Sequence, residues 1–151
     1  MWTRHLTTII KNWEVKLAQY GQWDWYPNGQ WLGLLNILKA IDIKKLSDIT
    51  DELKEVTQED YDAINKKIDE DKSFDWHKDF PEYSRDTGTE IIDLIYNKWV
   101  LKVQIDREML KPNIWIEWTF EINFDKNQYI CCGIDFPIDH LPDEKEFLSK
   151  F

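Results

Sequence analysis

The segment from Asn113 to Phe124 constrains the fold more than any other part of the chain. Apolar and polar side chains alternate along it, and the apolar set is Ile114, Ile116, Trp118, Phe120, Ile122 and Phe124. A period of two residues is the signature of a β-strand with one face against a core. β-branched and aromatic side chains suit such a pleated surface. We therefore predict a long, half-buried strand, whose other face carries Trp115, Glu117, Thr119, Glu121 and Asn123.

Two further segments are expected to complete a sheet. Residues 98–105 alternate in the same way, and residues 128–136 follow a turn predicted at Asp125–Asn127. Three consecutive strands predict an antiparallel meander. Lys98, Lys102 and Gln104 would then lie beside the acids on the polar face of the long strand.

The rest of the chain is predicted to be mainly helical. Residues 3–20 and 30–41 carry apolar side chains at three- and four-residue steps, which is typical of amphipathic helices. A short helix is expected around Ile49, and Thr57 with Asp60 resembles a capping box that opens another. Residues 89–97 and the tail after Pro142 are the last candidates. The prediction is an α+β fold, a single domain over residues 1–151, with N-terminal helices packed on a C-terminal antiparallel sheet of about three strands.

The charge of the chain is negative and uneven. The net charge is −10, and residues 48–86 hold fourteen acids against six lysines and arginines. Such a surface repels nucleic acid and anionic membranes and attracts basic proteins. The two cysteines, Cys131 and Cys132, are adjacent and too few for a disulfide framework, so a cytoplasmic setting is expected. Neither a signal peptide nor a membrane span is predicted.

Motifs for catalysis are missing from the sequence. It contains no nucleophile elbow and no glycine-rich phosphate loop. Asp75, His77 and Asp79 alternate and could begin a metal site if the segment were extended, but further ligands are not evident. We therefore expect neither enzymatic activity nor a cofactor. An alternative is a small carbohydrate-binding or glycoside-processing domain, in which Trp23, Trp25, Tyr26 and Trp31 offer a platform for sugar rings.

The segment from Asp69 to Gly88 is the best candidate for a binding surface. It is predicted to be a long loop in which Phe74, Trp76, Phe80 and Tyr83 alternate with acids. Aromatic anchors with charged neighbours are the ingredients of a protein–protein interface. A loop simply held to the domain by its aromatic side chains is the alternative interpretation.

Residues 80–92, with the sequence FPEYSRDTGTEII, resemble a stretch found in small, acidic bacterial immunity proteins. These proteins belong to contact-dependent inhibition and related polymorphic toxin systems, and the resemblance covers about a tenth of the chain. It implies a cytoplasmic inhibitor that binds a toxin domain, commonly a basic nuclease, and blocks its active or partner-binding site. An acidic mimic of nucleic acid is a further alternative. The contact surface predicted for this role comprises Asp69, Asp71, Asp75, Trp76, Asp79, Glu82 and Tyr83. Arg85 and Asp86 are expected to fix the loop to the following helix.

Overall fold

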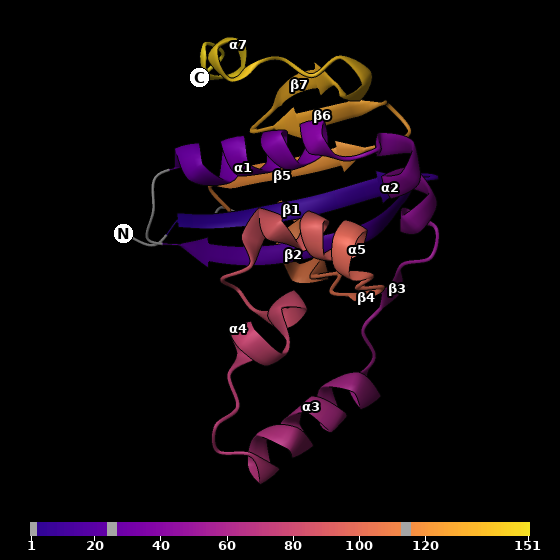
Figure 1. Ribbon diagram of the computed structural model, residues 1–151, viewed down its shortest axis with the longest axis vertical. Coiled ribbons are helices and arrows are strands. Elements are labelled where there is room, and N and C mark those ends of the chain that lie inside the picture. Colours follow the sequence, from indigo (N-terminus) through magenta and orange to yellow (C-terminus); the bar gives the residue numbers. More distant parts are fainter. Residues whose placement is uncertain (1–2, 24–26, 113–115) are drawn as a thin grey trace.

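The protein is built around a five-stranded mixed sheet. The computed structural model describes residues 3–23, 27–112 and 116–151 (Figure 1). The sheet has the strand order β2-β1-β5-β6-β7. Its strands are β1 (Thr3–Lys11), β2 (Glu14–Trp23), β5 (Trp118–Asn123), β6 (Gln128–Cys131) and β7 (Ile134–Pro137). β1 pairs in parallel with β5, while every other neighbouring pair is antiparallel. The N-terminal strand therefore lies inside the sheet, between its partner β2 and the C-terminal strands.

The helix predicted over residues 3–20 is wrong, because this segment forms the β1–β2 hairpin. Lys11 pairs with Glu14, so Asn12 and Trp13 are the two loop residues, with φ angles of 55° and 61°. Two positive φ angles are typical of a type I′ turn, which matches the twist of a hairpin. The two strands carry many β-branched residues, which favour strand over helix: Thr3, Thr7, Thr8, Ile9, Ile10 and Val15.

The predicted C-terminal meander is also wrong, although the α+β class is correct. Residues 98–105 contribute the short strand β4 (Lys102–Val103), which pairs with β3 (Lys54–Glu55) in a parallel ribbon, and a single bridge from Ile105 to Ala18 of β2. Lys98, Lys102 and Gln104 are therefore not cross-strand neighbours of the acids on β5. The strand predicted over residues 128–136 is two strands, because Cys132 and Gly133 form a turn with φ angles of 52° and 83°.

The strand expected between Asn113 and Phe124 is confirmed from Trp118 onward, with the predicted face inward. Phe120 and Ile122 are buried in the core and Trp118 packs against it, whereas Glu117 and Thr119 are exposed. Trp115 lies outside the described residues.

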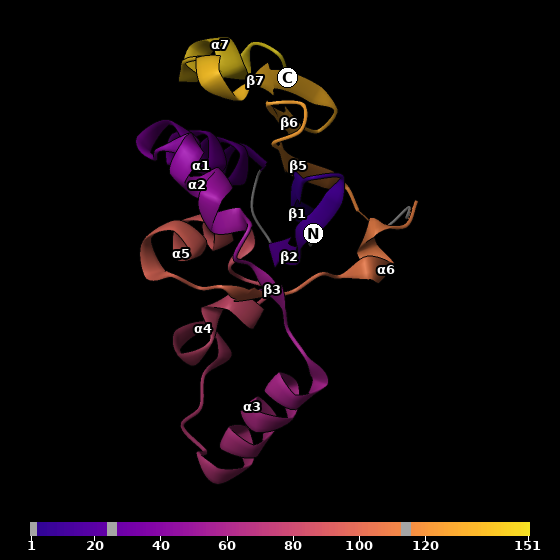
Figure 2. The ribbon, with the colours of Figure 1, turned by 90° about the vertical axis from the view of Figure 1, so that its right-hand side faces the viewer.

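Three helices cover one face of the sheet, as the edge-on view in Figure 2 shows. They are α1 (Pro27–Ala40), α2 (Ile43–Thr50) and α5 (Ile91–Lys98). α1 corresponds to the helix predicted over residues 30–41, and α5 to the one predicted over residues 89–97. Their apolar stripes bury Trp31, Leu34, Leu35, Leu38, Leu46, Ile49, Ile91, Ile92 and Ile95 against the sheet. The shorter elements are α6 (Arg107–Leu110), α7 (Glu144–Leu148) and the 3-10 turns η2 (Gly88–Glu90) and η3 (Ile138–His140).

Aromatic side chains close the C-terminal end of the core. The Trp31 ring lies 4.8 Å from that of Trp118 and 4.5 Å from that of Phe151, between ring centroids. Phe147 of α7 is fully buried, which confirms the predicted terminal helix. Trp31 is only 6% exposed, so it is a core residue and not part of an open sugar platform. Trp25 and Tyr26, like the side chain of Trp23, lie outside the described part of the chain.

Candidate functional site

Residues 57–83 form an arm that projects away from the sheet (Figures 1 and 2). The arm contains α3 (Gln58–Glu70), α4 (Trp76–Asp79) and the 3-10 turn η1 (Pro81–Tyr83). Between Gln58 and Tyr83 the sequence has nine acids and four lysines. The segment predicted as a long loop thus contains two short helical turns, and together with α3 it is the most prominent acidic feature of the molecule.

The first helix of the arm is stabilised at its start by the predicted capping box. The Thr57 hydroxyl accepts a hydrogen bond from the Asp60 amide at 3.3 Å, and the Asp60 carboxylate accepts one from the Thr57 amide at 2.9 Å. This reciprocal pairing satisfies two amides that the first turn of a helix leaves without partners. Ile64 is the one residue classed as buried among the arm's described side chains. Local hydrogen bonds therefore define α3 more than burial does.

Two contacts attach α3 to the body of the protein. Lys102 Nζ lies 2.7 Å from the Asp60 carboxylate, and Gln104 Nε2 donates to the Tyr61 hydroxyl at 3.1 Å. Hydrogen bonds from Lys102, and then from Thr57, lower the pKa of Asp60 to about 2. This carboxylate is therefore charged under all physiological conditions.

The other end of the arm is attached to the body of the protein by Ser84 and Arg85. The Ser84 carbonyl accepts from Gln19 Nε2 at 3.2 Å, and the Arg85 carbonyl accepts from the Gln22 amide at 3.1 Å. The Arg85 guanidinium also lies over the Tyr20 ring, 5.8 Å from its centroid. Arg85 thus fixes the chain to β2, whereas the sequence predicted a contact with the following helix.

Aromatic contacts order residues 74–83 and connect them to α3. The ring centroids of Phe74 and Phe80 are 5.8 Å apart, and Tyr83 lies 6.0 Å from Phe80 and 5.8 Å from Tyr61. Burial, with smaller contributions from nearby Glu82, Asp60 and Tyr61, raises the pKa of Tyr83 to about 12. Tyr83 is half-buried and neutral. Its ring contacts with Phe80 and Tyr61 support the arm in the free protein.

A groove of about 340 Å³ lies between the end of α3 and α4. Its lining residues are Lys67, Glu70, Asp71, Phe74, Asp79 and Phe80. Hydrogen bonds from the Ser73 hydroxyl at 2.6 Å and the Ser73 amide at 2.9 Å hold the pKa of Asp71 below its usual value. Lys67 Nζ lies over the Phe80 ring, 5.2 Å from its centroid. The groove therefore combines two phenyl rings with three carboxylates and one cation.

Of the predicted contact residues, Asp71 and Asp79 line this groove. Asp69 and Asp75 are exposed, and Glu82 is half-buried. The Asp75 carboxylate accepts from the Lys78 amide at 3.3 Å, and the Asp79 carboxylate accepts from the Asp75 amide at 3.0 Å, so both also shape α4. Trp76 is the first residue of α4, and its side chain lies outside the described part.

The metal site considered for Asp75, His77 and Asp79 required an extended backbone. That backbone is not formed, because Trp76–Asp79 is the helix α4. The side chain of His77 is not among those described. Within the described residues, no group of three or more His, Cys, Asp or Glu side chains could hold a metal ion.

The sequence-based choice of contact residues omitted four residues that line the groove: Lys67, Glu70, Phe74 and Phe80. Phe74 and Phe80 were visible as aromatic residues among acids. Lys67 and Glu70 belong to α3, and they meet the phenyl rings only because the chain folds back after Asp71. No local sequence pattern indicates that Lys67 and Glu70 lie close to these phenyl rings.

No protein-family model, curated protein or solved structure matches this chain. Among the described residues, no helix combines the length and apolar character needed to cross a membrane.

The groove is suited to bind a long cationic side chain. The methylene groups of an arginine or lysine can pack on Phe74 and Phe80 while its charged end meets the carboxylates of Glu70, Asp71 and Asp79. The Lys67 ammonium already lies over one face of the Phe80 ring. A partner's arginine would compete with it, because a guanidinium pairs with a carboxylate through two parallel hydrogen bonds.

Proposed function

We propose that this protein is a non-enzymatic inhibitor that binds a basic protein through its arm, in the manner of an immunity protein against a toxin domain. The observation that carries the proposal is the groove on a projecting, strongly acidic arm, where carboxylates surround two partly exposed phenyl rings. The resemblance of residues 80–92 to immunity proteins agrees with this role. The proposed function requires a protein partner, and it requires no reaction catalysed by this protein.

The arm offers the two features that fast and specific inhibition needs. Its excess of acids accelerates encounter with a cationic surface, particularly at low ionic strength. Its phenyl rings provide apolar area that can be desolvated at the centre of an interface. Blocking the toxin then follows from occupying the basic surface with which a nuclease holds phosphates.

The test uses the C-terminal domain encoded by the gene immediately upstream, produced as a catalytically inactive variant. Binding to the inhibitor is measured by titration calorimetry at 50 and 300 mM NaCl. We expect the double variant D71N/D79N to bind at least about tenfold more weakly at low salt, with a smaller dependence on salt than the wild type.

A matched control changes the same charge elsewhere. Asp135 on β7 and Asp139 in η3 are both exposed and lie outside the arm. D135N/D139N should bind as the wild type does. Equal affinities for the two double variants would show that the arm is not the contact surface. Failure of the wild-type protein to bind the domain, or to protect cells that produce its active form, would refute the proposed function.

A further inference from the structure

The two cysteines lie where strand β6 passes into its hairpin turn. Cys131 ends β6 and is fully buried in the core. Cys132 is the first residue of the two-residue turn to β7 and has a φ of 52°. Successive side chains of a strand point to opposite faces, with φ about −120° to −140° at each residue. At Cys132 the rotation about N–Cα differs from this by roughly half a turn, so its side chain lies on the same side as that of Cys131.

Two observations agree with this orientation. Cys132 is half-buried and packs against the core cluster that contains Cys131. The thiols are also in hydrogen-bonding contact, and the hydrogen bond that Cys131 donates lowers the pKa of Cys132. The same contact, together with burial, raises the pKa of Cys131. The pair therefore keeps its proton on Cys131, and Cys132 is the sulfur that can act as a thiolate.

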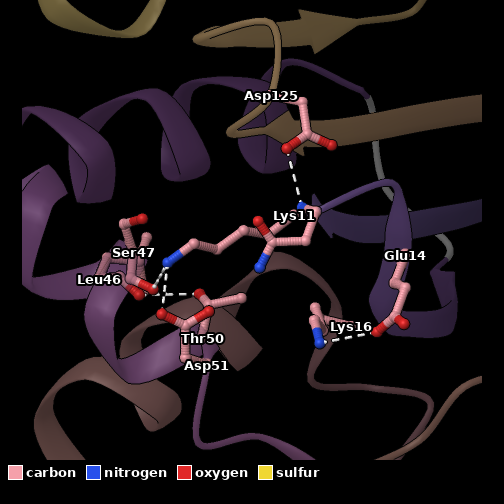
Figure 3. A network of polar contacts seen from close by, with 9 residues as sticks. Lys11, Glu14, Lys16, Leu46, Ser47, Thr50, Asp51 and Asp125 are labelled. Atoms are coloured by element: carbon pink, nitrogen blue, oxygen red, sulfur yellow. Dashed lines mark hydrogen bonds and ion pairs between the residues drawn. The ribbon is translucent and has the colours of Figure 1, made fainter.

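Cysteine is an unusual residue for the first position of this turn. Asn-Gly is the preferred pair of a type I′ turn, and the β1–β2 turn has Asn12 at the equivalent position. Polar contacts of Lys11 and Asp125 fasten that turn to α2 and to the β5–β6 loop, as Figure 3 shows. At the β6–β7 turn the Cys132 amide donates to a backbone carbonyl of β5 at 2.9 Å, a bond that other residues could make equally well. The cysteine side chain is thus explained by its contact with Cys131 and not by the turn.

We propose that Cys131 and Cys132 are a redox-active pair, which a hydroperoxide oxidises to a disulfide between neighbouring residues. With hydrogen peroxide, the Cys132 thiolate attacks one oxygen, the O–O bond breaks, and the departing hydroxide takes up a proton to become water. Cys132 is then a sulfenic acid. The Cys131 sulfur attacks the sulfenic sulfur, the S–O bond breaks, and a second water leaves. Overall the two thiols lose two electrons and two protons, and one hydrogen peroxide is reduced to two waters.

The disulfide is expected to be strained and therefore readily reversed. Consecutive Cα atoms are about 3.8 Å apart, whereas the Cα atoms of ordinary disulfides are about 4.4–6.8 Å apart. Closing the ring must also move the Cys131 sulfur, which shares the core with Phe120, Tyr129 and Phe147. So small a ring restricts the unfolded chain little, and no entropic gain offsets the strain. Oxidation should thus weaken the C-terminal part of the sheet, and thiols should reduce the strained bond easily.

Oxidation is measured on the tryptic peptide 127–145, which contains both cysteines. The reduced protein is treated with hydrogen peroxide, remaining thiols are blocked with iodoacetamide, and the peptide mass is determined. We expect a peptide lighter by two hydrogen atoms that carries no alkylated cysteine, and we expect dithiothreitol to restore both thiols. The oxidised protein should melt at least about 3 °C below the reduced protein, and dithiothreitol should reverse the shift.

C132N is the matched control, because asparagine suits the first position of the turn. It should melt no lower than the reduced wild type, and peroxide should leave its melting temperature unchanged, which separates the cysteine pair from oxidation of the methionines. A second variant, C131A, tests the buried thiol. Its Cys132 should react with iodoacetamide at pH 7 at least about threefold more slowly than in the wild type, because the hydrogen bond that favours the thiolate is lost.

Three results would overturn the redox pair. Peroxide treatment that gives only higher sulfur oxides, or a disulfide between two protein molecules, would show that the two thiols do not react with each other. An oxidised form as stable as the reduced form would contradict the strain on which reversal depends. Equal alkylation rates of Cys132 in the wild type and C131A would remove the activating contact. None of these results bears on binding by the arm, so the proposed function is tested separately.

Discussion

At the scale of single residues, two glycines leave the space that the buried side chain of His5 fills. Its ring is 3% exposed and lies against Gly21, the residue opposite it on β2. A Cβ added to Gly21 would sit 2.2 Å from His5 Nε2, and one added to Gly88 would sit 2.9 Å from the same atom. Both glycines therefore leave room for the His5 side chain. At Gly88 the backbone φ of +54° also favours glycine over other residues.

The first prediction compares two glycine-to-alanine changes. G21A should destabilise the protein by about 1–3 kcal/mol, because the buried imidazole cannot move away without disturbing its neighbours. Gly29 lies in the first turns of α1, and a Cβ there would meet nothing within 4 Å. G29A should therefore stabilise the protein by about 0.5–1 kcal/mol. Urea unfolding of both variants checks the opposite signs, and a neutral G21A would contradict this packing.

The second prediction concerns acid sensitivity. Burial lowers the pKa of His5 from 6.5 to about 4. Between these values the unfolded chain binds a proton that the folded protein does not, so stability falls as the pH falls. The slope from this residue approaches about 1.4 kcal/mol per pH unit near pH 5. Urea unfolding between pH 7 and 4.5 measures it.

A matched variant separates His5 from the other histidines. His140 is exposed in η3, so H140Q should keep the slope of the wild type. NMR should show the His5 imidazole still neutral at pH 5. An imidazole that titrates near 6.5 would refute the prediction.

At the scale of elements, local signals identified those elements that local chemistry specifies. The capping box at Thr57 and Asp60 marked the start of α3, and the apolar stripes marked α1 and α5. The alternation in β5 indicated both the strand and its buried face. In each case the deciding contacts lie within one element or between that element and an apolar core.

The β1–β2 hairpin escaped prediction because its turn carries only half of the usual signal. Asn12 suits the first position of a type I′ turn, but Trp13 replaces the expected glycine. The apolar residues of the segment also fall at three- and four-residue steps, which favoured a helix. The compensation comes from Asp125, more than a hundred residues away. Such a long-range contact cannot be seen in a local pattern.

The candidate site was predictable in its chemistry but not in its geometry. The density of acids and aromatic residues drew attention to the segment that contributes to the groove, and two of the chosen acids line it. The groove itself depends on the chain folding back so that Lys67 of α3 lies over Phe80, whose ring stacks on Phe74. Trp99, expected on a strand, instead ends α5 in a left-handed conformation that its residue type does not suggest.

At the scale of the whole molecule, the two ends of the sequence share one sheet. β1 pairs with β2 on one side and with β5 on the other, so the N-terminal hairpin and the C-terminal strands are continuous. The core mixes them as well, because Ile9, Leu17 and Leu34 share one cluster with residues contributed by the last strands and α7: Phe120, Ile122, Tyr129 and Phe147. Among the described residues, neither half of the chain has a core of its own.

The last prediction follows from this arrangement. The fragment 1–112 retains most of the helices but loses β5, β6, β7 and α7, which leaves one edge of β1 and one end of the core open to water. We expect it to show no cooperative urea transition and little near-ultraviolet circular dichroism. Adding the peptide 113–151 should restore both, because it supplies the missing strand partner and the aromatic side chains. A fragment 1–112 that unfolds cooperatively by itself would show that the chain contains two folding units, and the single domain predicted from the sequence would be wrong.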